Sequence, residues 1–496
     1  MTDISPNSAA TPARKPTRGQ IATPLSFIGN EKPRLNQFTV SHVANMPADV
    51  EALTVQLFQI WRNKYPRNLL RSHYFNAVEE LKNLNISVPT KVADRVRSVT
   101  GWPAKAVRAL ADLTRYQGLS LDNEDTYSLK AIAARNDFET MIPQLVTSAY
   151  KHSCAFLTVT KDPQTGLAVI MPRSAQMSAG LWDREHNRLA GALTITRTDS
   201  TGKPDKFVVW LPGQMWEVEH QDGGNWTGTY HEQAYKGVAC TAYAYDPQLD
   251  RPFGRSRITR PLMAYTDAAN RELLRIEITA EFYSAPRLWF LGIDDDALGG
   301  NKWETLITSV NGITKDAEGG VPQMQQVSQM SMQPHSDLLR TLALMVSSET
   351  NLPVSDLGIT TENPASAEAQ MVAERKLTRD ADRQNSLLAR TLQTTLGIAA
   401  AVENDSETIP AEAYNASVLF APTRETSLGA RGDFFTKVAS VAPAWVKTTT
   451  AWNMLGLTSE QAEEALRAVR TAETASVLDT IAAKVNQQKT TEEPEQ

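Results

Sequence analysis

The sequence predicts an α+β protein of several domains, and three patterns indicate that class. Residues 150–244 hold short alternating or apolar runs separated by Gly, Pro, Asp and Asn, which is typical of strands. From Leu262 to Tyr283, apolar residues recur every three or four positions, the period of one long helix. Beyond Pro364 the patterns are again mainly helical. A chain of 496 residues is long enough for several domains.

Composition limits the class of protein. Hydrophobic residues make up 41% of the chain and charged residues 21%, as in soluble globular proteins. No apolar run approaches the roughly 18 residues of a membrane span, and the first residues lack the apolar core of a secretory signal. From the missing secretory signal we expect folding in a cytoplasm, and Cys154 and Cys240 are too few for a disulfide framework. The net charge of −6 argues against a conventional nucleic-acid binder with a basic face.

The first third of the chain is predicted to begin with an arm and to continue in helices. Residues 1–35 are rich in Pro, Ser, Thr and Ala and carry an excess of basic residues, which predicts a disordered arm. From Val50 to about Asn83 the pattern predicts two helices, the second passing through Tyr74; the apolar face of the first comprises Leu53, Leu57, Ile60 and Trp61. A further helix is expected from Pro103 to Tyr116, ended by Gly118.

The middle third combines the strand-rich part with the long helix. We expect four tryptophans to pack the strands, namely Trp182, Trp210, Trp216 and Trp226. The long helix begins after a turn at Gly254 and ends before Pro286. Residues 285–334 are predicted to form a small mixed segment, with the strand-like runs RLWFLGI and QMQQVSQM and a short helix that begins near Trp303.

A second helix is predicted from Ser336 to Thr350, ending before Pro353. After a connecting loop, Asn363 and Pro364 supply an N-cap and a first-turn residue for a helix that runs to about Gly397.

The last part of the chain, residues 405–484, is predicted to be mainly helical. Thr458 and Gln461 have the spacing of a capping box, in which each side chain bonds the backbone N–H of the other residue. The final residues, 485–496, are polar and are predicted to form a disordered tail.

Signatures of catalysis and cofactor binding are missing from the sequence. It contains no Walker motif and no dinucleotide fingerprint after a strand. The run HEQAY at His231 lacks the second histidine of a zincin helix, and no histidine lies near a cysteine at ligand spacing. Asp294, Asp295 and Asp296 fit a solvated turn better than a cation site. We therefore expect no enzyme activity, no cofactor and no metal.

Three stretches of the chain resemble the portal proteins of tailed bacteriophages, in the branch found in actinobacteriophages: Gly101–Leu121, Arg251–Ile293 and Leu352–Ala369. The resemblance continues in order from about Leu69 to about Ala468, which makes it more specific than any single motif. It implies a ring of subunits, twelve in virions, at one vertex of the capsid. DNA is pumped in and later leaves through such a ring.

The resemblance also implies a portal fold with a wing, a long-helix stem, a small α/β clip and a helical crown. Mapped onto this sequence, the parts are the arm 1–35, the wing 36–256 (β-rich at 150–244), the first stem helix 257–284, the clip 285–334, the second stem helix 335–351, the tunnel loop 352–363, a wing or tunnel helix 364–400, the crown 401–484 and the tail 485–496.

Three sets of residues then become candidate sites. Subunit contacts in the stem are expected at Leu262, Tyr265, Leu273, Ile276 and Tyr283; the channel-facing loop holds Asp356, Thr360, Thr361, Glu362 and Asn363; and the clip concentrates Trp289, Phe290 and Trp303. Without the resemblance, the stem stripe fits an ordinary core helix and the loop a surface connection. A fourth set is either a solvated face or a basic belt, formed by Arg375, Lys376, Arg379 and Arg383.

The partners implied by the resemblance are copies of the same chain, the large subunit of terminase, head-completion or adaptor proteins, and the major capsid and scaffold proteins. Double-stranded DNA would pass through the channel with weak, non-specific contact, and no membrane is involved. The expected location is the portal vertex of the virion, with assembly in the host cytoplasm. The alternatives are another structural or adaptor protein of a virion and a cytosolic enzyme of unrecognised class.

Overall fold

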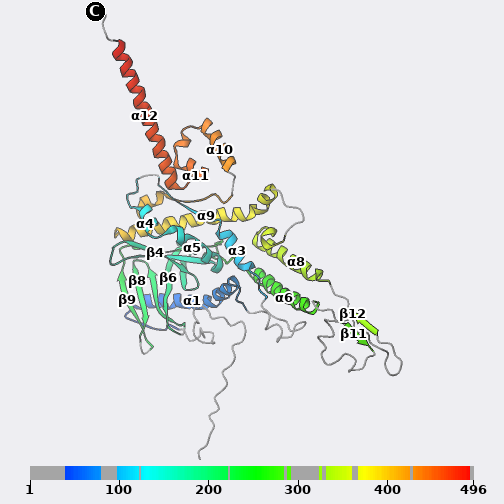
Figure 1. Ribbon diagram of the computed structural model, residues 1–496. Coiled ribbons are helices and arrows are strands. Elements are labelled where there is room, and N and C mark those ends of the chain that lie inside the picture. Colours follow the sequence, from blue (N-terminus) through cyan, green and yellow to red (C-terminus); the bar gives the residue numbers. More distant parts are fainter. Residues whose placement is uncertain are drawn as a thin grey trace, which may run out of the picture.

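Two parts extend from one body that contains most of the sheets and helices (Figure 1). Helices α6 (Arg260–Tyr283) and α8 (Gln333–Thr350) run out side by side, and helix α12 (Ser459–Thr491) extends from a different side. The computed structural model describes residues 39–79, 98–121, 124–200, 202–221, 224–283, 288–291, 323–326, 331–359, 367–424 and 428–491. The predicted arm, 1–35, lies outside these ranges.

The larger sheet has six strands in the order β1-β9-β8-β7-β6-β5. Its neighbours are antiparallel except for β1 and β9, which are parallel. The strands are β1 (Val43–Ala44), β5 (Ser178–Asp183), β6 (Arg188–Thr198), β7 (Pro204–Leu211), β8 (Gln214–His220) and β9 (Trp226–Glu232). The side chains of Trp210 and Trp216 are buried in or beside this sheet, as predicted.

A second sheet has the antiparallel order β10-β3-β4, with β3 at Cys154–Lys161, β4 at Ala168–Ser174 and β10 at Cys240–Ala244. The strand-rich character predicted for residues 150–244 is therefore confirmed. Both cysteines lie in these strands, buried and unbonded, and burial raises the pKa of the Cys154 thiol to about 11.

Helix α1 (Ala48–Phe75) packs on the larger sheet. The rings of Phe58 and Phe207 lie 5.4 Å apart, and the indole N–H of Trp61 donates to the carbonyl of Gln176 at 3.0 Å. The predicted boundary between two helices before Tyr74 is wrong, because α1 continues through Pro66 to Phe75. Pro66 points to solvent while the aromatic side chains of the opposite face anchor the helix to the sheet.

Helix α9 (Ala367–Glu403) crosses the body and packs against the three-stranded sheet. Its buried stripe includes Leu388, Leu392 and Leu396, all fully inaccessible to solvent. Helix α5 (Phe138–His152) contacts the same sheet. The helix predicted after Pro364 is thus confirmed, and its end lies at Glu403 rather than near Gly397.

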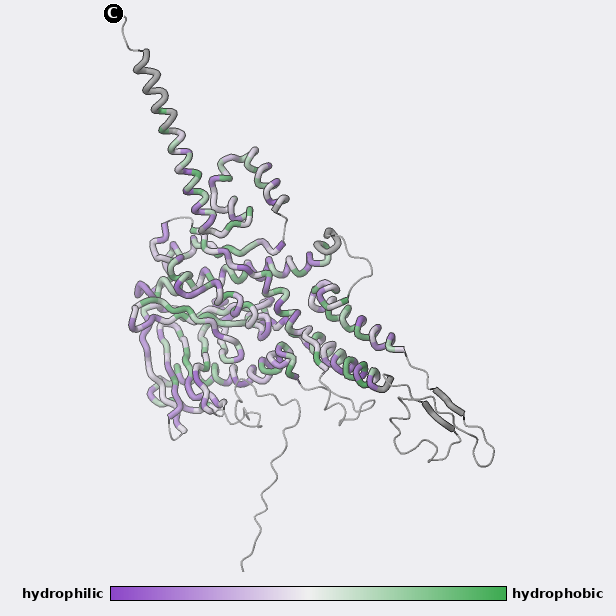
Figure 2. The backbone as a smooth tube through the Cα atoms, in the orientation of Figure 1, coloured by the Kyte–Doolittle hydropathy of each residue, from purple (hydrophilic) through white to green (hydrophobic). Residues whose placement is uncertain are grey.

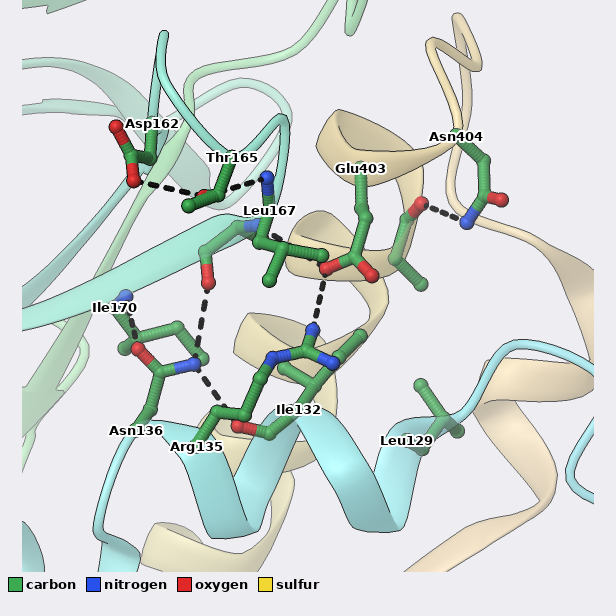
Figure 3. Close-up of polar contacts among 12 residues, drawn as sticks. Leu129, Ile132, Arg135, Asn136, Asp162, Thr165, Leu167, Ile170, Glu403 and Asn404 are labelled. Atoms are coloured by element: carbon green, nitrogen blue, oxygen red, sulfur yellow. Dashed lines mark hydrogen bonds and ion pairs between the residues drawn. The ribbon is translucent and has the colours of Figure 1, made fainter.

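The C-terminal end of α9 is fixed to the body by a polar cluster (Figure 3). Glu403 accepts hydrogen bonds from the Arg135 guanidinium at 2.7 Å and from the backbone N–H of Ala168 at 3.1 Å. Asn136, which follows helix α4 (Leu129–Arg135), accepts from the N–H of Ile170 at 2.7 Å. One cluster therefore joins α4, β4 and α9.

The segment around Tyr116 differs from its predicted structure. Helix α3 (Trp102–Ala111) is shorter than expected, and β2 (Tyr116–Leu121) follows it and pairs antiparallel with β13 (Ala416–Phe420). Gly118 lies within β2, at φ 134°, and does not end a helix. The partner strand is about 300 residues away in sequence, so local spacing held no sign of it.

The C-terminal part contains α10 (Leu428–Val441), α11 (Thr449–Leu455) and α12, with 3-10 turns at Ala411–Asn415 and Trp445–Lys447. It is mainly helical, as predicted, apart from β13. The capping box is confirmed by two hydrogen bonds, from the N–H of Gln461 to Thr458 Oγ1 and from the N–H of Thr458 to Gln461 Oε1. The tail predicted to be disordered from residue 485 is helical as far as Thr491, because α12 continues through it.

Candidate functional site

The base of the α6 and α8 pair is held in the body by buried polar groups. Asp267 accepts a hydrogen bond from the Tyr74 hydroxyl at 2.8 Å, and Asn270 accepts one from the backbone N–H of Thr100 at 2.8 Å. Both side chains are buried inside their own chain. The polar side of α6 at Asp267 and Asn270 is therefore an internal contact of the chain.

Arg257, just before α6, connects three elements. Its guanidinium donates to the carbonyl of Ala106 at 2.5 Å, to the carbonyl of Thr350 at 2.5 Å and to the Tyr245 hydroxyl at 3.0 Å. Thr350 is the last residue of α8, so Arg257 satisfies a carbonyl that the helix itself leaves unpaired. The side chain is buried, and its three acceptors fix the ends of both long helices to α3.

Further out, Glu272 links the two helices. Its carboxylate accepts from His335 on α8 at 2.5 Å and from Arg275, one turn along α6, at 2.9 Å. The Glu272 side chain is only 4% exposed, so this contact is shielded from bulk water. The pair is therefore joined by a hydrogen bond between the middle of α6 and the first turn of α8, as well as by its base.

The apolar residues of the pair are incompletely covered. Leu262 is fully buried in the main core of its own chain, so a neighbouring subunit is not needed to cover it. Tyr265, Leu273 and Ile276 are half-buried. On α8, Leu338 is 42% exposed, Leu344 47% and Met345 44%. Hydrophobic residues thus continue along both helices away from the body (Figure 2). Of the predicted contacts, only the side chain of Tyr283 lies outside the described part.

Strands β11 (Leu288–Leu291) and β12 (Gln323–Gln326) pair antiparallel, with Trp289 opposite Gln325 and Phe290 opposite Met324. Both strand-like runs of the predicted small segment are confirmed by this pairing. Trp303 and the helix expected from it fall outside the described residues, as do Asp294–Asp296.

The loop after α8 is anchored at its start. Leu352 and Pro353 are buried, and the carbonyl of Leu352 accepts a hydrogen bond from the Ser347 hydroxyl at 2.6 Å. A short 3-10 helix follows, Val354–Leu357, on which Asp356 is exposed. The first part of the loop is therefore held against the body, because Leu352 joins the main core. Thr360, Thr361, Glu362 and Asn363 lie outside the described ranges.

The basic residues of α9 divide into two groups. Arg383 forms ion pairs with Asp246 at 3.1 Å and Asp380 at 3.9 Å. Arg375, Lys376 and Arg379 are exposed and take part in no ion pair with another described residue. The predicted set therefore contains one structural arginine and three exposed cations.

Elsewhere, the described residues offer little that could support chemistry. Those residues contain no group of three or more His, Cys, Asp and Glu side chains that could hold a metal ion. None of their helices is long and apolar enough to cross a membrane. His231 lies on β9 with an exposed side chain, as expected from its strand-rich surroundings.

Comparison with known proteins decides the family. A sequence model of the family described as "Phage portal protein, SPP1 Gp6-like" matches residues 56–476. The chain belongs to this portal protein family. Its similarity to the portal protein of Mycobacterium phage L5 is 24% identity over 410 residues, which cover 79% of this chain and 83% of that protein. The portal protein of Mycobacterium phage D29 is 23% identical over 431 residues, with coverage of 80% and 84%.

These matches confirm the predicted resemblance, including its actinobacteriophage branch, and the viral portal function. The family is structural, which disfavours the enzyme alternative. Among solved structures, a chain from the neck of a native GTA particle computed with C12 symmetry is 13% identical, with a TM-score of 0.40, and the match covers 75% of this chain and 95% of that one.

Proposed function

We propose that this portal protein assembles into a ring at one capsid vertex, with α6 and α8 as stem helices, β11 and β12 in the clip and the loop 352–363 facing a central channel. The ring serves as the channel for DNA packaging and ejection. It also binds terminase through the clip and, later, the head-completion proteins. The α10 to α12 region corresponds to the crown.

The apolar surface left uncovered on α6 and α8 carries this proposal. Leu338, Leu344 and Met345 remain more than two-fifths exposed although α6 packs beside them. Because each of these side chains is already more than half buried, its burial by another subunit would contribute roughly 1 kcal/mol. Repeated contacts of one kind between unlike faces close into a ring when the rotation between subunits permits it.

Negative-stain microscopy of the purified protein tests the ring. We expect rings from the native chain and none from the double variant Leu273→Asp, Ile276→Asp, because each buried charge would cost on the order of several kcal/mol. Leu338→Asp with Leu344→Asp repeats the test at exposed positions that the single chain does not need for folding. Control substitutions at Leu249 and Val441, which are 103% and 85% exposed, should preserve the rings. Rings from both stem variants would refute the stem assignment.

A further inference from the structure

Five basic side chains gather where three helices of the body meet. Lys64, Arg67 and Arg71 lie on α1 at spacings of three and four, which place them on one face of the helix. Arg108 comes from α3, and Lys151 from the last turn of α5. These five residues are called the basic surface below. None of them belonged to a site predicted from the sequence.

Contacts around Phe75 show that the basic surface is continuous. The Lys151 ammonium lies 4.9 Å from the centre of the Phe75 ring, and the Arg108 guanidinium lies 5.6 Å from it. Arg71 donates to the carbonyl of His152, the residue after Lys151, at 3.0 Å. Burial, and next the neighbouring charge of Arg67, lower the pKa of Arg71 to about 10. The cations of all three helices therefore share one patch.

The part of the chain that the structure describes does not neutralise this patch. No member of the basic surface forms an ion pair with another described residue, including Asp112, one turn beyond Arg108 on α3. Lys64, Arg67 and Arg108 are exposed, whereas many other cations of the described chain are paired. Like charges placed side by side on helices cost free energy. An external polyanion would relieve that cost.

The close spacing of the five cations indicates which kind of anion would bind them. Double-stranded DNA carries one negative charge per roughly 1.7 Å of its axis, which can supply several cations at once. Lys and Arg side chains on three helices can contact the phosphate groups of the backbone, and such contacts do not distinguish one base sequence from another.

We propose that the basic surface binds the phosphate backbone of double-stranded DNA without sequence preference, as a contact separate from the loop 352–363. This inference rests on the proposed function in that the portal role brings DNA to the chain. It assigns the holding of DNA to α1, α3 and α5. The loop, whose residues 352–363 include no Lys or Arg, lets the duplex slide.

The test is a salt titration of DNA binding by the full chain, followed by fluorescence anisotropy of a labelled random-sequence duplex. The variant Lys64→Glu, Arg67→Glu, Arg108→Glu changes only exposed positions. The slope of log K against log salt is negative, and each lost phosphate contact reduces its magnitude by about 0.9, so the loss of three should reduce the magnitude by about 2.7. At moderate salt we expect the affinity to fall at least about tenfold.

The matched control is Lys203→Glu, Lys236→Glu, Lys437→Glu, which makes the same charge change at exposed positions outside the basic surface. It should keep the native slope and nearly the native affinity. An unchanged slope in the Lys64, Arg67, Arg108 variant would overturn the inference, and so would an equal loss in the control. Unchanged DNA binding would leave an acidic protein as the partner of this patch.

Microscopy of the same samples separates this inference from the proposed function. If the native chain forms rings and the variant keeps the native salt slope, the ring proposal is supported and the proposed DNA surface is refuted. If the native chain formed no rings, and DNA binding were lost in the Lys64, Arg67, Arg108 variant but not in the control, the DNA surface would be supported and the ring proposal refuted.

Discussion

His152 shows how one buried residue makes the stability of the fold depend on pH. It is 1% exposed, and its ring nitrogens lie 2.9 Å from the Ser72 hydroxyl and 3.1 Å from the Ser174 hydroxyl. Burial, followed by the charges of Lys151 and Arg71, holds the pKa of His152 well below its usual 6.5. The imidazole therefore remains neutral in the folded chain at a pH where the unfolded chain binds a proton.

This residue predicts a loss of stability in mild acid. Because the folded pKa is depressed, the contribution of His152 is complete above pH 6.5 and is lost as the pH falls below it toward the folded value. Between pH 7.5 and pH 5.5 the loss should be about 1.4 kcal/mol in the free energy of unfolding. Urea unfolding at the two pH values measures it.

The variant His152→Gln is the comparison, since it removes the titrating group and keeps a side chain that can bond the two serines. It should be less stable at pH 7.5 but should lose less stability on acidification than the native chain. Equal losses in the two proteins would show that other groups cause the pH dependence.

Local residue roles could be predicted from the sequence, and long-range ones could not. Thr458 and Gln461 form the capping box that their spacing indicated, because both partners lie within one helical turn. Glu272 meets His335 across 63 positions, and Arg257 reaches Thr350 across 93. Spacing along one element contains no information on such contacts. The basic surface was missed for the same reason, and the net charge of −6 concealed it further.

At the scale of elements, α1 shows tertiary packing overriding a local signal. Proline inside a helix removes one backbone hydrogen bond and clashes with the preceding turn, at a cost of about 3 kcal/mol. Helix α1 nevertheless continues past Pro66, held by residues such as Leu57, Trp61 and Tyr65 that are buried along its opposite face. The pattern had predicted two helices here, so the continuity of α1 comes from packing that neither the pattern nor the proline indicated.

The variant Pro66→Ala should accordingly stabilise the chain, because it restores a backbone donor to α1 and relieves the clash. Part of the gain is offset by the greater freedom of the unfolded chain, so we expect about 1–2 kcal/mol. Thermal unfolding measures the change. Pro334→Ala is the control, since that proline occupies the first turn of α8, where the N–H has no partner within the helix, and it should give no gain.

The long helices and the strand-rich part followed from periodicity, whereas the pairing of β2 with β13 did not. Residues such as Leu388, Leu392 and Leu396 repeat along α9, so their common burial was visible in the sequence. Strand β13 is short and lies in a region of helical patterns, and its partner precedes it by almost 300 residues. A strand of this kind is specified by what covers and pairs with it, which only the folded chain reveals.

At the scale of the whole molecule, two proposed DNA contacts have opposite charge. The basic surface concentrates five cations, whereas residues 352–363 include Asp356 and Glu362 and no Lys or Arg. Attraction to the basic surface lengthens the time that DNA stays bound. The lack of attraction at the loop keeps the barrier to sliding low. A ring multiplies both effects by the number of subunits, so a change of charge in the loop should have a much larger effect than in a monomer.

We therefore expect the double variant Asp356→Lys, Glu362→Lys to slow or stall DNA translocation while rings still form. It would create phosphate contacts in every subunit at the point where the duplex must slide, and the stall should weaken as salt rises. DNA packaged per procapsid at matched ring occupancy is the measurement. Glu185→Lys with Glu412→Lys makes the same charge change at exposed positions outside the loop and should package normally. The control removes the effect of overall positive charge, which both variants share. If the loop variant also packages DNA normally, residues 352–363 do not face the DNA.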